Sequence, residues 1–454
     1  MKKQNKYRRR KAPASSRKPS CKLDAQDVQF SVEALVAFWQ KLSSVFQRRE
    51  QRDWFLFYLC GQLSNLKRKT IEPMVLGLHG AESQVVRALQ YHIGQSGWES
   101  QTLIARLQTL TAEWLGDPAG VLIVDGSGFP KQGPESVGVA RQYCGHLGKV
   151  ANCQEGVFLV YASPQGYTFV DERLYMHQSW FQDGTQARWQ RCAIPDKTIF
   201  RTEPELALEM IQQIVERDQL PFRWVTADEH FGQNPAFLQG ISDLGKWYLA
   251  EVPADTRFWV RRPAIEPPGQ GILGRPRLHA RVIKSAPSPH EIRKLVERLP
   301  DSTWKPYVIK EGSRGPLQAE FAFLRLVTVH EKLPGERVWV ILRRTLNVPP
   351  IIKYYISNAP STCTPADFVW ASGMRWPIET ALEEGKGEVG LDHYETRSWQ
   401  GWHHHMAQTF AAHLFLMHLR LLFKKKSSAH DLTDSAIGRP SYRRRLPTFT
   451  GHPA

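Results

Sequence analysis

Residues 28–115 are predicted to form helices, because apolar positions recur there at intervals of three and four residues. In VEALVAFWQKL this spacing links Leu35, Trp39 and Leu42. The stretch DWFLFYLCGQL, residues 53–63, is apolar nearly all round and predicts a buried helix. The Gly-Asp-Pro sequence that follows the last of these helices is a typical helix stop.

From residue 120 the pattern changes to that of strands alternating with helices. The runs VLIVD, EGVFLVYAS, YTFVDERLYM, FRWVTAD and KWYLAEV predict strands, whereas PELALEMIQQIVERD and NPAFLQGISDLG predict helices. A Pro-Gln-Gly turn between the second and third runs predicts a hairpin. The expected order is three strands, a helix, a strand, a helix and a strand, which is a mixed α/β fold.

Residues 253–350 interrupt this alternation. They contain the loop-like PPGQGILGRPR and the strand-like YVIKEG, AFLRLVTVH and RVWVILRR. A segment of this length is better explained as an inserted β-rich subdomain than as a loop. The strand-like run IIKYYISNA (351–359) then returns the chain to the core, and helical sequence follows up to residue 423.

The sequence therefore predicts an all-helical N-terminal domain before an α/β core with an inserted β-rich subdomain. The predicted parts are a basic arm at 1–24, the helical domain at 25–117, the first part of the core at 118–252, the insertion at 253–350, the second part of the core at 351–423, and a basic tail at 424–454.

The charge of the chain favours a polyanionic partner. The net charge is +16, and residues 1–22 alone hold ten Lys or Arg and no acid. Residues 424–454 hold seven basic and two acidic residues, so residues 23–423 carry only about one net charge. A body that is nearly neutral must place any positive surface locally if it grips nucleic acid.

Cysteine and hydropathy patterns indicate the compartment. The six cysteines form no CxxC pair and no zinc spacing, which fits a reducing environment. No apolar run is long enough to span a membrane, and the basic start lacks the apolar segment of a signal peptide. We therefore expect a cytoplasmic protein without membrane contact.

Two acids stand at the C-terminal ends of predicted strands. Asp125 ends VLIVD and Asp228 ends FRWVTAD. If these strands are neighbours in one sheet, the two carboxylates converge and repel each other unless a cation lies between them. Oxygen ligands of this kind favour Mg²⁺ or Mn²⁺. The alternative, that each Asp only forms a turn or caps a helix, is about equally consistent with the residues.

A third acid is expected on a helix beside the sheet. RWPIETALEEGK offers Glu379, Glu383 and Glu384, and its Pro377 suits the first turn of a helix. That placement puts Glu379 where the helix dipole favours a negative charge. Lys386 returns to the same face, but so does Glu383, and a surface helix of mixed charge is also consistent with this pattern.

Three stretches together resemble the DDE transposases of bacterial insertion sequences. They are DGSGFPKQGPESVGVARQYCGHLGKVANCQEGV, VTADEHFG and RWPIETALEEGKGEVGLDHYETRSWQGWHHHMA. The closest resemblance is to the branch with a strand-rich insertion between the second Asp and the Glu. It implies an RNase H-like core in which Asp125, Asp228 and Glu379 are catalytic acids that bind two Mg²⁺ or Mn²⁺ ions.

The family's signature around the Glu is Tyr-x2-Arg-x3-Glu-x6-Lys. Arg375, Glu379 and Lys386 fit this spacing, which selects Glu379 over Glu383, whereas Ser372 stands at the Tyr position. The resemblance implies that Arg375 and Lys386 contact DNA beside the acids. Any contact that the Tyr makes in relatives is in doubt here.

The resemblance also implies the reaction. In the family, the enzyme binds the terminal repeats of its element, cuts the DNA ends, and uses the freed 3′-hydroxyl to attack target DNA. The expected partner is double-stranded DNA, bound by a dimer. Alternatives are an inactive protein that only binds transposon ends, and a metal-dependent nuclease that never joins strands. The helical N-terminal domain favours a transposase, because end recognition needs a separate reader.

Several other residues have both a structural and a functional interpretation. Lys131, Arg141 and Lys149 follow Asp125 in a polar segment and are predicted to contact DNA, although simple solvation is equally consistent. Adjacent helical residues point about 100° apart, so the run His403 to His405 is interpreted as structural or phosphate-facing rather than as a metal site. The insertion also holds three tryptophans that we expect mainly in the core, with base stacking as the alternative: Trp259, Trp304 and Trp339.

Overall fold

The computed structural model describes residues 24–269, 278–310 and 315–437. It divides into two compact units, Met1–Lys41 with Leu422–Ala454, and Leu42–Leu421. The predicted basic arm, apart from Asp24, and the part of the predicted tail beyond residue 437 lie outside the described residues.

The first unit contains α1 (Ala25–Leu42) and the last part of α13 (Trp399–Ile437). Lys426 Nζ lies 2.6 Å from Asp27 Oδ1, and the ring of Phe30 packs edge-on against Phe423 at 5.7 Å. The helix α13 therefore continues beyond residue 423, where the sequence predicts that the core ends. No Pro or Gly occurs between residues 424 and 437 to stop it.

The second unit begins with helices α2 to α5, and the first three of them enclose a small apolar cluster around Tyr58, Met74 and Leu89. A Cβ added to Gly61 would lie 2.6 Å from Met74 Sδ, so glycine permits the close packing of the first two helices. The helices are α2 (Arg49–Leu63), α3 (Ile71–Leu78), α4 (Ser83–Gly94) and α5 (Ser100–Leu115).

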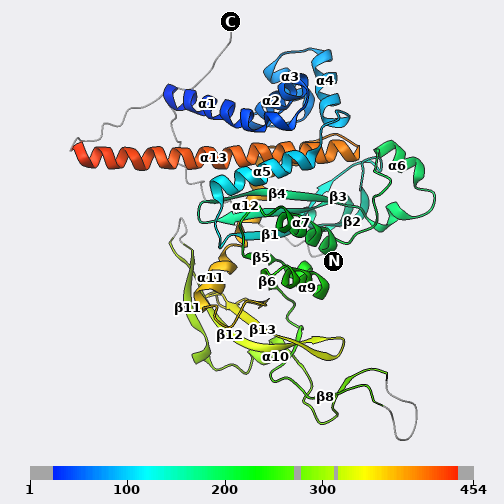
Figure 1. The fold of residues 1–454 in the computed structure, drawn as a ribbon, viewed down its shortest axis with the longest axis vertical. Helices are drawn as coiled ribbons and strands as arrows, with labels where there is room; N and C mark the ends of the chain where they lie inside the picture. Colours follow the sequence, from blue (N-terminus) through cyan, green and yellow to red (C-terminus); the bar gives the residue numbers. More distant parts are fainter. Residues whose placement is uncertain (1–23, 270–277, 311–314, 438–454) are drawn as a thin grey trace, which may run out of the picture. The chain divides into compact units, whose positions relative to one another are not determined.

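The core sheet has the predicted strands in the order β4-β3-β1-β5-β6 (Figure 1). Strand β1 runs antiparallel to β3 and parallel to β5, and β5 runs parallel to β6. This mixed arrangement is the RNase H-like α/β fold expected from the sequence. One strand, β2, is additional and forms a hairpin with β3. The bounds are β1 (Val121–Pro130), β2 (Ala140–Cys144), β3 (Lys149–Ser163), β4 (Gly166–Tyr175), β5 (Trp224–Ala227) and β6 (Trp247–Glu251).

The insertion is rich in strands, as predicted, but most of them extend the core sheet rather than forming a separate one. Strand β14 pairs with β6, and next to β14 come β13, then β12, then β7. These strands and the core strands belong to one 12-stranded sheet in the described chain. Pairing β6 in this way removes an exposed strand edge. The elements are β7 (Arg257–Trp259), β8 (Ile265–Glu266), β9 (Arg281–Val282), β10 (His290–Glu291), α10 (Ile292–Val296), β11 (Lys305–Lys310), β12 (Leu317–His330), β13 (Leu333–Arg344) and β14 (Ile352–Ser357).

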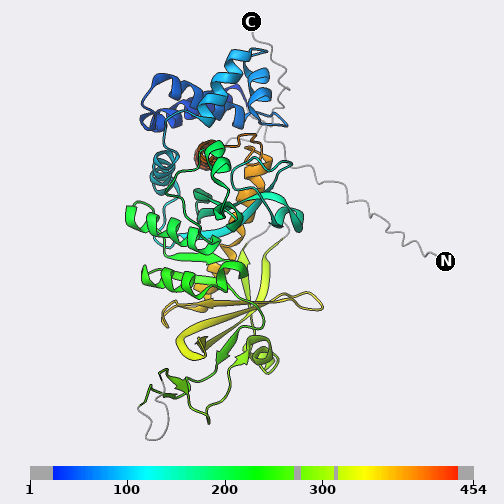
Figure 2. The same ribbon diagram turned by 90° about the vertical axis from the view of Figure 1, so that its right-hand side faces the viewer.

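Helices cover both faces of the core strands. Figure 2 shows α7 and α9 in green on one side and α12 in orange on the other, and α12 contacts β1, β3 and β4. The helices are α6 (Gln186–Cys192), α7 (Glu203–Arg217), α8 (Glu229–Gly232), α9 (Pro235–Asp243), α11 (Pro365–Gly373) and α12 (Trp376–Gly387). Within the described residues, no helix has the length and apolarity needed to cross a bilayer.

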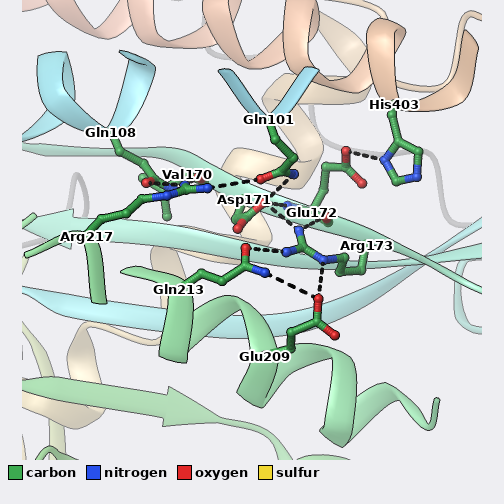
Figure 3. A network of polar contacts seen from close by, with 10 residues as sticks. All are labelled: Gln101, Gln108, Val170, Asp171, Glu172, Arg173, Glu209, Gln213, Arg217 and His403. Atoms are coloured by element: carbon green, nitrogen blue, oxygen red, sulfur yellow. Dashed lines mark hydrogen bonds and ion pairs between the residues drawn. The ribbon is translucent and has the colours of Figure 1, made fainter. Parts of the chain in front are cut away.

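Strand β4 places charged residues on both faces of the sheet, where they are buried (Figure 3). Asp171 and Glu172 are each 0% exposed. Asp171 accepts from Arg173 at 2.8 Å, and Arg173 also donates to Gln213 of α7 at 2.7 Å. Glu172 points the other way and lies 2.7 Å from His403 Nδ1 on α13. These contacts tie helices on opposite faces to a single strand.

Candidate active site

The two predicted acids lie together where the parallel pairing of β1 and β5 stops. Asp228 directly follows β5, as predicted, but β1 continues beyond Asp125, so the prediction that Asp125 ends its strand is wrong. The last residue pair of the parallel strands β1 and β5 is Val124 and Ala227, and Asp125 and Asp228 come directly after it. Asp228 also caps α8, because its Oδ1 accepts the backbone N–H of Phe231 at 3.2 Å. Asp228 therefore caps α8 and also lies beside Asp125.

Helix α12 brings the Arg-Glu pair of the signature against Asp125. Arg375 directly precedes the helix, and Glu379 lies in its first turn. Arg375 Nη2 is 3.8 Å from Asp125 Oδ2, and Arg375 Nη1 is 3.6 Å from Glu379 Oε1. Glu379 and Glu383 are both exposed, but of the two it is Glu379 that is in ion-pair contact with Arg375, whereas Glu384 binds Arg420 at 2.9 Å. The geometry thus favours Glu379 as the third acid.

Crowding of carboxylates perturbs Asp125. Burial, and then the nearby charge of Asp228, raise the pKa of Asp125 to about 7. Arg375 and the backbone N–H of Gly126, 2.9 Å from Asp125 Oδ1, act in the opposite direction. A carboxyl group with a pKa this high in a cluster of acids is typical of a functional site.

Two further glutamates lie at this edge, and the sequence analysis did not identify them. A Cβ added to Gly126 would lie 3.1 Å from Glu155 Oε1 and 3.4 Å from Glu203 Oε2, so both carboxylates approach β1 where it lacks a side chain. Glu155 belongs to β3 and Glu203 to the first turn of α7, 3.6 Å from His230. In the local sequence, Gly126 alone indicated a close approach at this point, because Glu155 and Glu203 are distant from it along the chain.

Glu155 gives the site a testable pH dependence. Burial, and then Glu203, raise the pKa of Glu155 to about 8 from an ordinary value of 4.5. The contribution of Glu155 to the free energy of unfolding is therefore complete below about pH 4.5 and is lost as the pH rises through about 8. We expect the melting temperature of wild type to fall more steeply across this window than that of Glu155→Gln, which does not titrate. Parallel melting curves for the two proteins would contradict this assignment.

The predicted DNA-binding lysines and arginines occupy different settings. Lys386 Nζ lies 3.5 Å from the carbonyl oxygen of Gly128, and burial lowers its pKa. Lys131 packs over the ring of Tyr394 at 3.6 Å, and burial lowers its pKa to about 8. Arg141 and Lys149 are exposed on the β2–β3 hairpin. Of the predicted cations, Arg375 is the one in ion-pair contact with Asp125 and Glu379.

The histidine run and the insertion tryptophans are structural. His404 stacks on Trp98 at 3.7 Å, and His405 lies 2.7 Å from the hydroxyl of Tyr58. With His403 on Glu172, the three side chains reach three different partners. Of the tryptophans, Trp259 and Trp304 are buried, and Trp339 donates to the carbonyl oxygen of Pro360. The structural interpretation of the histidines is confirmed, and Trp259 and Trp304 belong to the core, whereas Trp339 is only partly buried.

The strand order, with Asp125 and Asp228 directly after the paired segments of β1 and β5, fits the RNase H-like class of nucleic-acid-cutting enzymes. The family model described as "DDE superfamily endonuclease" matches residues 41–316, which is more than half of the chain. The chain therefore belongs to this family, whose members act on DNA phosphodiester bonds. The matched region includes Asp125 and Asp228 but ends before Glu379.

The chain is also similar to a protein whose description is more specific than that of the family model. The chain is 25% identical over 376 residues to a protein of Microchaete diplosiphon described as "Probable transposase for insertion sequence element IS701". That similarity covers 80% of this chain and 83% of the relative. The resemblance to insertion-sequence transposases seen in the sequence is thereby confirmed.

Membership of this family implies dependence on a divalent metal. The chemistry of the predicted ligands suits such an ion, since Asp125, Asp228 and Glu379 carry the carboxylate oxygens that Mg²⁺ and Mn²⁺ prefer. Among the described residues, however, no three His, Cys, Asp or Glu side chains are arranged so that they could hold a metal ion. Arg375, in contact with two of the three acids, contributes the nearby positive charge.

Proposed function

We propose that this protein is a DNA transposase that binds the terminal repeats of its insertion sequence, cleaves the DNA at the ends, and joins the 3′-hydroxyl to target DNA. One observation carries the proposal. The parallel pairing of β1 with β5 stops at Val124 and Ala227, so Asp125 and Asp228 follow side by side, and α12 adds Arg375 and Glu379 beside Asp125.

Each residue of the cluster has a role in this reaction. Asp125, Asp228 and Glu379 would hold two Mg²⁺ or Mn²⁺ ions. Such ions, when bound, supply an activated nucleophile and stabilise the leaving oxygen of the phosphodiester. Lys386, fixed near the carbonyl oxygen of Gly128, is placed to hold a phosphate of the DNA strand beside the acids.

The distribution of charge supports DNA as the partner. The insertion, residues 253–350, contains 18 Lys or Arg and nine Asp or Glu, so its excess of positive charge is local. With the basic first 22 residues, it gives the chain two cationic segments that can contact phosphates. Arg141 and Lys149, exposed on the β2–β3 hairpin, and the partly buried Lys131 are proposed as further contacts.

We also propose that two copies act together, because a transposase must hold both ends of its element. Two identical subunits related by a twofold axis can bind two identical ends in equivalent ways. Mixing the protein with end-bearing duplex and measuring the mass of the complex by light scattering should give two protein chains per pair of duplexes.

Three activities can be separated in one assay. The protein is incubated with Mg²⁺, a labelled fragment that carries the terminal repeats, and a target plasmid. We expect cleavage at the ends together with a joined product, and neither product when EDTA replaces Mg²⁺. Cleavage without joining would instead identify a nuclease, and a mobility shift without cleavage would identify a binding protein.

A further inference from the structure

Arg375 occupies a central place among the acids. Its guanidinium group contacts Asp125 at 3.8 Å and Glu379 at 3.6 Å, and its side chain is only 18% exposed. The Arg375 Nε–H is buried and has no hydrogen-bond partner in the described part of the chain. The arginine is thus held by charge, and part of its hydrogen-bonding capacity is unused.

This arrangement compensates the charge of the acids. A partly buried carboxylate is stabilised by a nearby cation, and the Arg375 guanidinium group lies 3.8 Å from Asp125, whose side chain is only 21% exposed. A divalent ion bound by the same carboxylates would repel the guanidinium group strongly at these distances. Arg375 and the metal ions therefore compete for one set of oxygens.

A neighbouring cavity offers Arg375 another position. It has a volume of about 320 Å³ and lies between α12 and the insertion strands, and Arg375 itself lines it together with Lys310 and Arg343. Arg343 Nε is also buried without a hydrogen-bond partner among the described residues. Lys353, which faces Arg343 on the neighbouring strand β14, is already paired with Glu251 at 2.9 Å. An anion in this cavity would satisfy both guanidinium groups.

We propose that Arg375 is an exchangeable counter-ion. It neutralises Asp125 and Glu379 in the free protein and moves to a backbone phosphate in the neighbouring cavity when DNA binds. This inference rests on the proposed function for the identity of the metal site and of the DNA. Because coupling between two ligands is reciprocal, DNA then tightens metal binding and metal tightens DNA binding.

The test measures Mn²⁺ affinity by titration calorimetry, with and without DNA. The DNA is a pre-cleaved duplex of the terminal sequence with a 3′-dideoxy end, which offers no nucleophile for joining. We expect Arg375→Gln to bind Mn²⁺ about tenfold more tightly than wild type in the absence of DNA, because the competing cation is gone. DNA should tighten Mn²⁺ binding to wild type and have little effect on the variant.

Two further variants keep the test interpretable. Arg420→Gln removes an arginine that binds Glu384 on the same helix α12, and it should bind Mn²⁺ like wild type. Arg375→Lys keeps the charge without the guanidinium fork and should bind Mn²⁺ with an affinity between those of wild type and Arg375→Gln. Circular dichroism confirms that each variant is folded.

The outcomes distinguish this inference from the proposed function. Equal or weaker Mn²⁺ binding by Arg375→Gln would overturn the counter-ion role. Equal tightening by DNA in wild type and Arg375→Gln would do the same, because simple attraction of Mn²⁺ by the polyanion would then explain the effect. If Asp125→Asn binds Mn²⁺ as wild type does, the metal site of the proposed function itself is wrong.

Discussion

Replacing Asp125 with Asn is expected to lower the rate of DNA cleavage by about 10³-fold or more, since a lost metal ligand removes several kcal/mol of transition-state stabilisation. Asp228→Asn and Glu379→Gln should have effects of similar size. Binding of the end-bearing duplex should stay close to that of wild type, because most DNA affinity comes from cationic side chains. Cleavage of a labelled duplex and a mobility-shift titration measure the two properties separately.

The matched control lies on the same helix as the third acid. Glu383 is four residues beyond Glu379 on α12, exposed, and has the same chemistry. Glu383→Gln should therefore cleave DNA at nearly the wild-type rate. If Glu383→Gln is inactive and Glu379→Gln is active, the assignment of the third acid is wrong, although the roles of Asp125 and Asp228 would stand.

Arg173→Met is expected to destabilise the protein by about 3–5 kcal/mol, the usual cost of leaving a buried charge without its partner. Arg173 binds Asp171 at 2.8 Å and Glu209 at 3.4 Å, and Asp171 is completely buried. Methionine fills a similar volume, so the loss comes mainly from the unpaired carboxylate rather than from a cavity. Chemical denaturation followed by circular dichroism measures the change in the free energy of unfolding.

A surface ion pair provides the comparison for this variant. Arg191 lies 3.1 Å from Glu135, and both side chains are about half exposed. Arg191→Met should change the free energy of unfolding by no more than about 1 kcal/mol, because water solvates the remaining glutamate. If the two arginine variants lose the same amount of stability, the buried network of Figure 3 does not contribute as described.

The sequence could predict the features that depend on local pattern. Short apolar runs before Asp125 and Asp228 identify the buried parts of β1 and β5, and the parallel pairing of these parts brings the two acids together, although β1 continues beyond Asp125. Pro377 identifies the first turn of α12, which fixes the position of Glu379. The alternation of strands and helices predicted the order of elements along the chain, the resemblance to DDE transposases implied the RNase H-like core, and the structure shows the strand order β4-β3-β1-β5-β6.

Other features depend on partners that are far apart in the chain. Glu155 and Glu203 meet at Gly126 only because β3 and α7 flank β1, and no local pattern records that contact. Asp171 and Glu172 lie within a strand-like run, and their burial follows from partners on α7 and α13. The pairing of β6 with β14 likewise joins segments about 100 residues apart, so the continuity of the sheet into the insertion was not predictable.

The most direct test of the central claim is to locate bound Mn²⁺ by anomalous scattering in crystals of the protein bound to its pre-cleaved end duplex. We expect Mn²⁺ peaks ligated by Asp125, Asp228 and Glu379, with Arg375 withdrawn from the acids. Mn²⁺ bound by Asp228 and Glu203 instead, with Glu379 still paired to Arg375, would contradict the assignment of the catalytic acids.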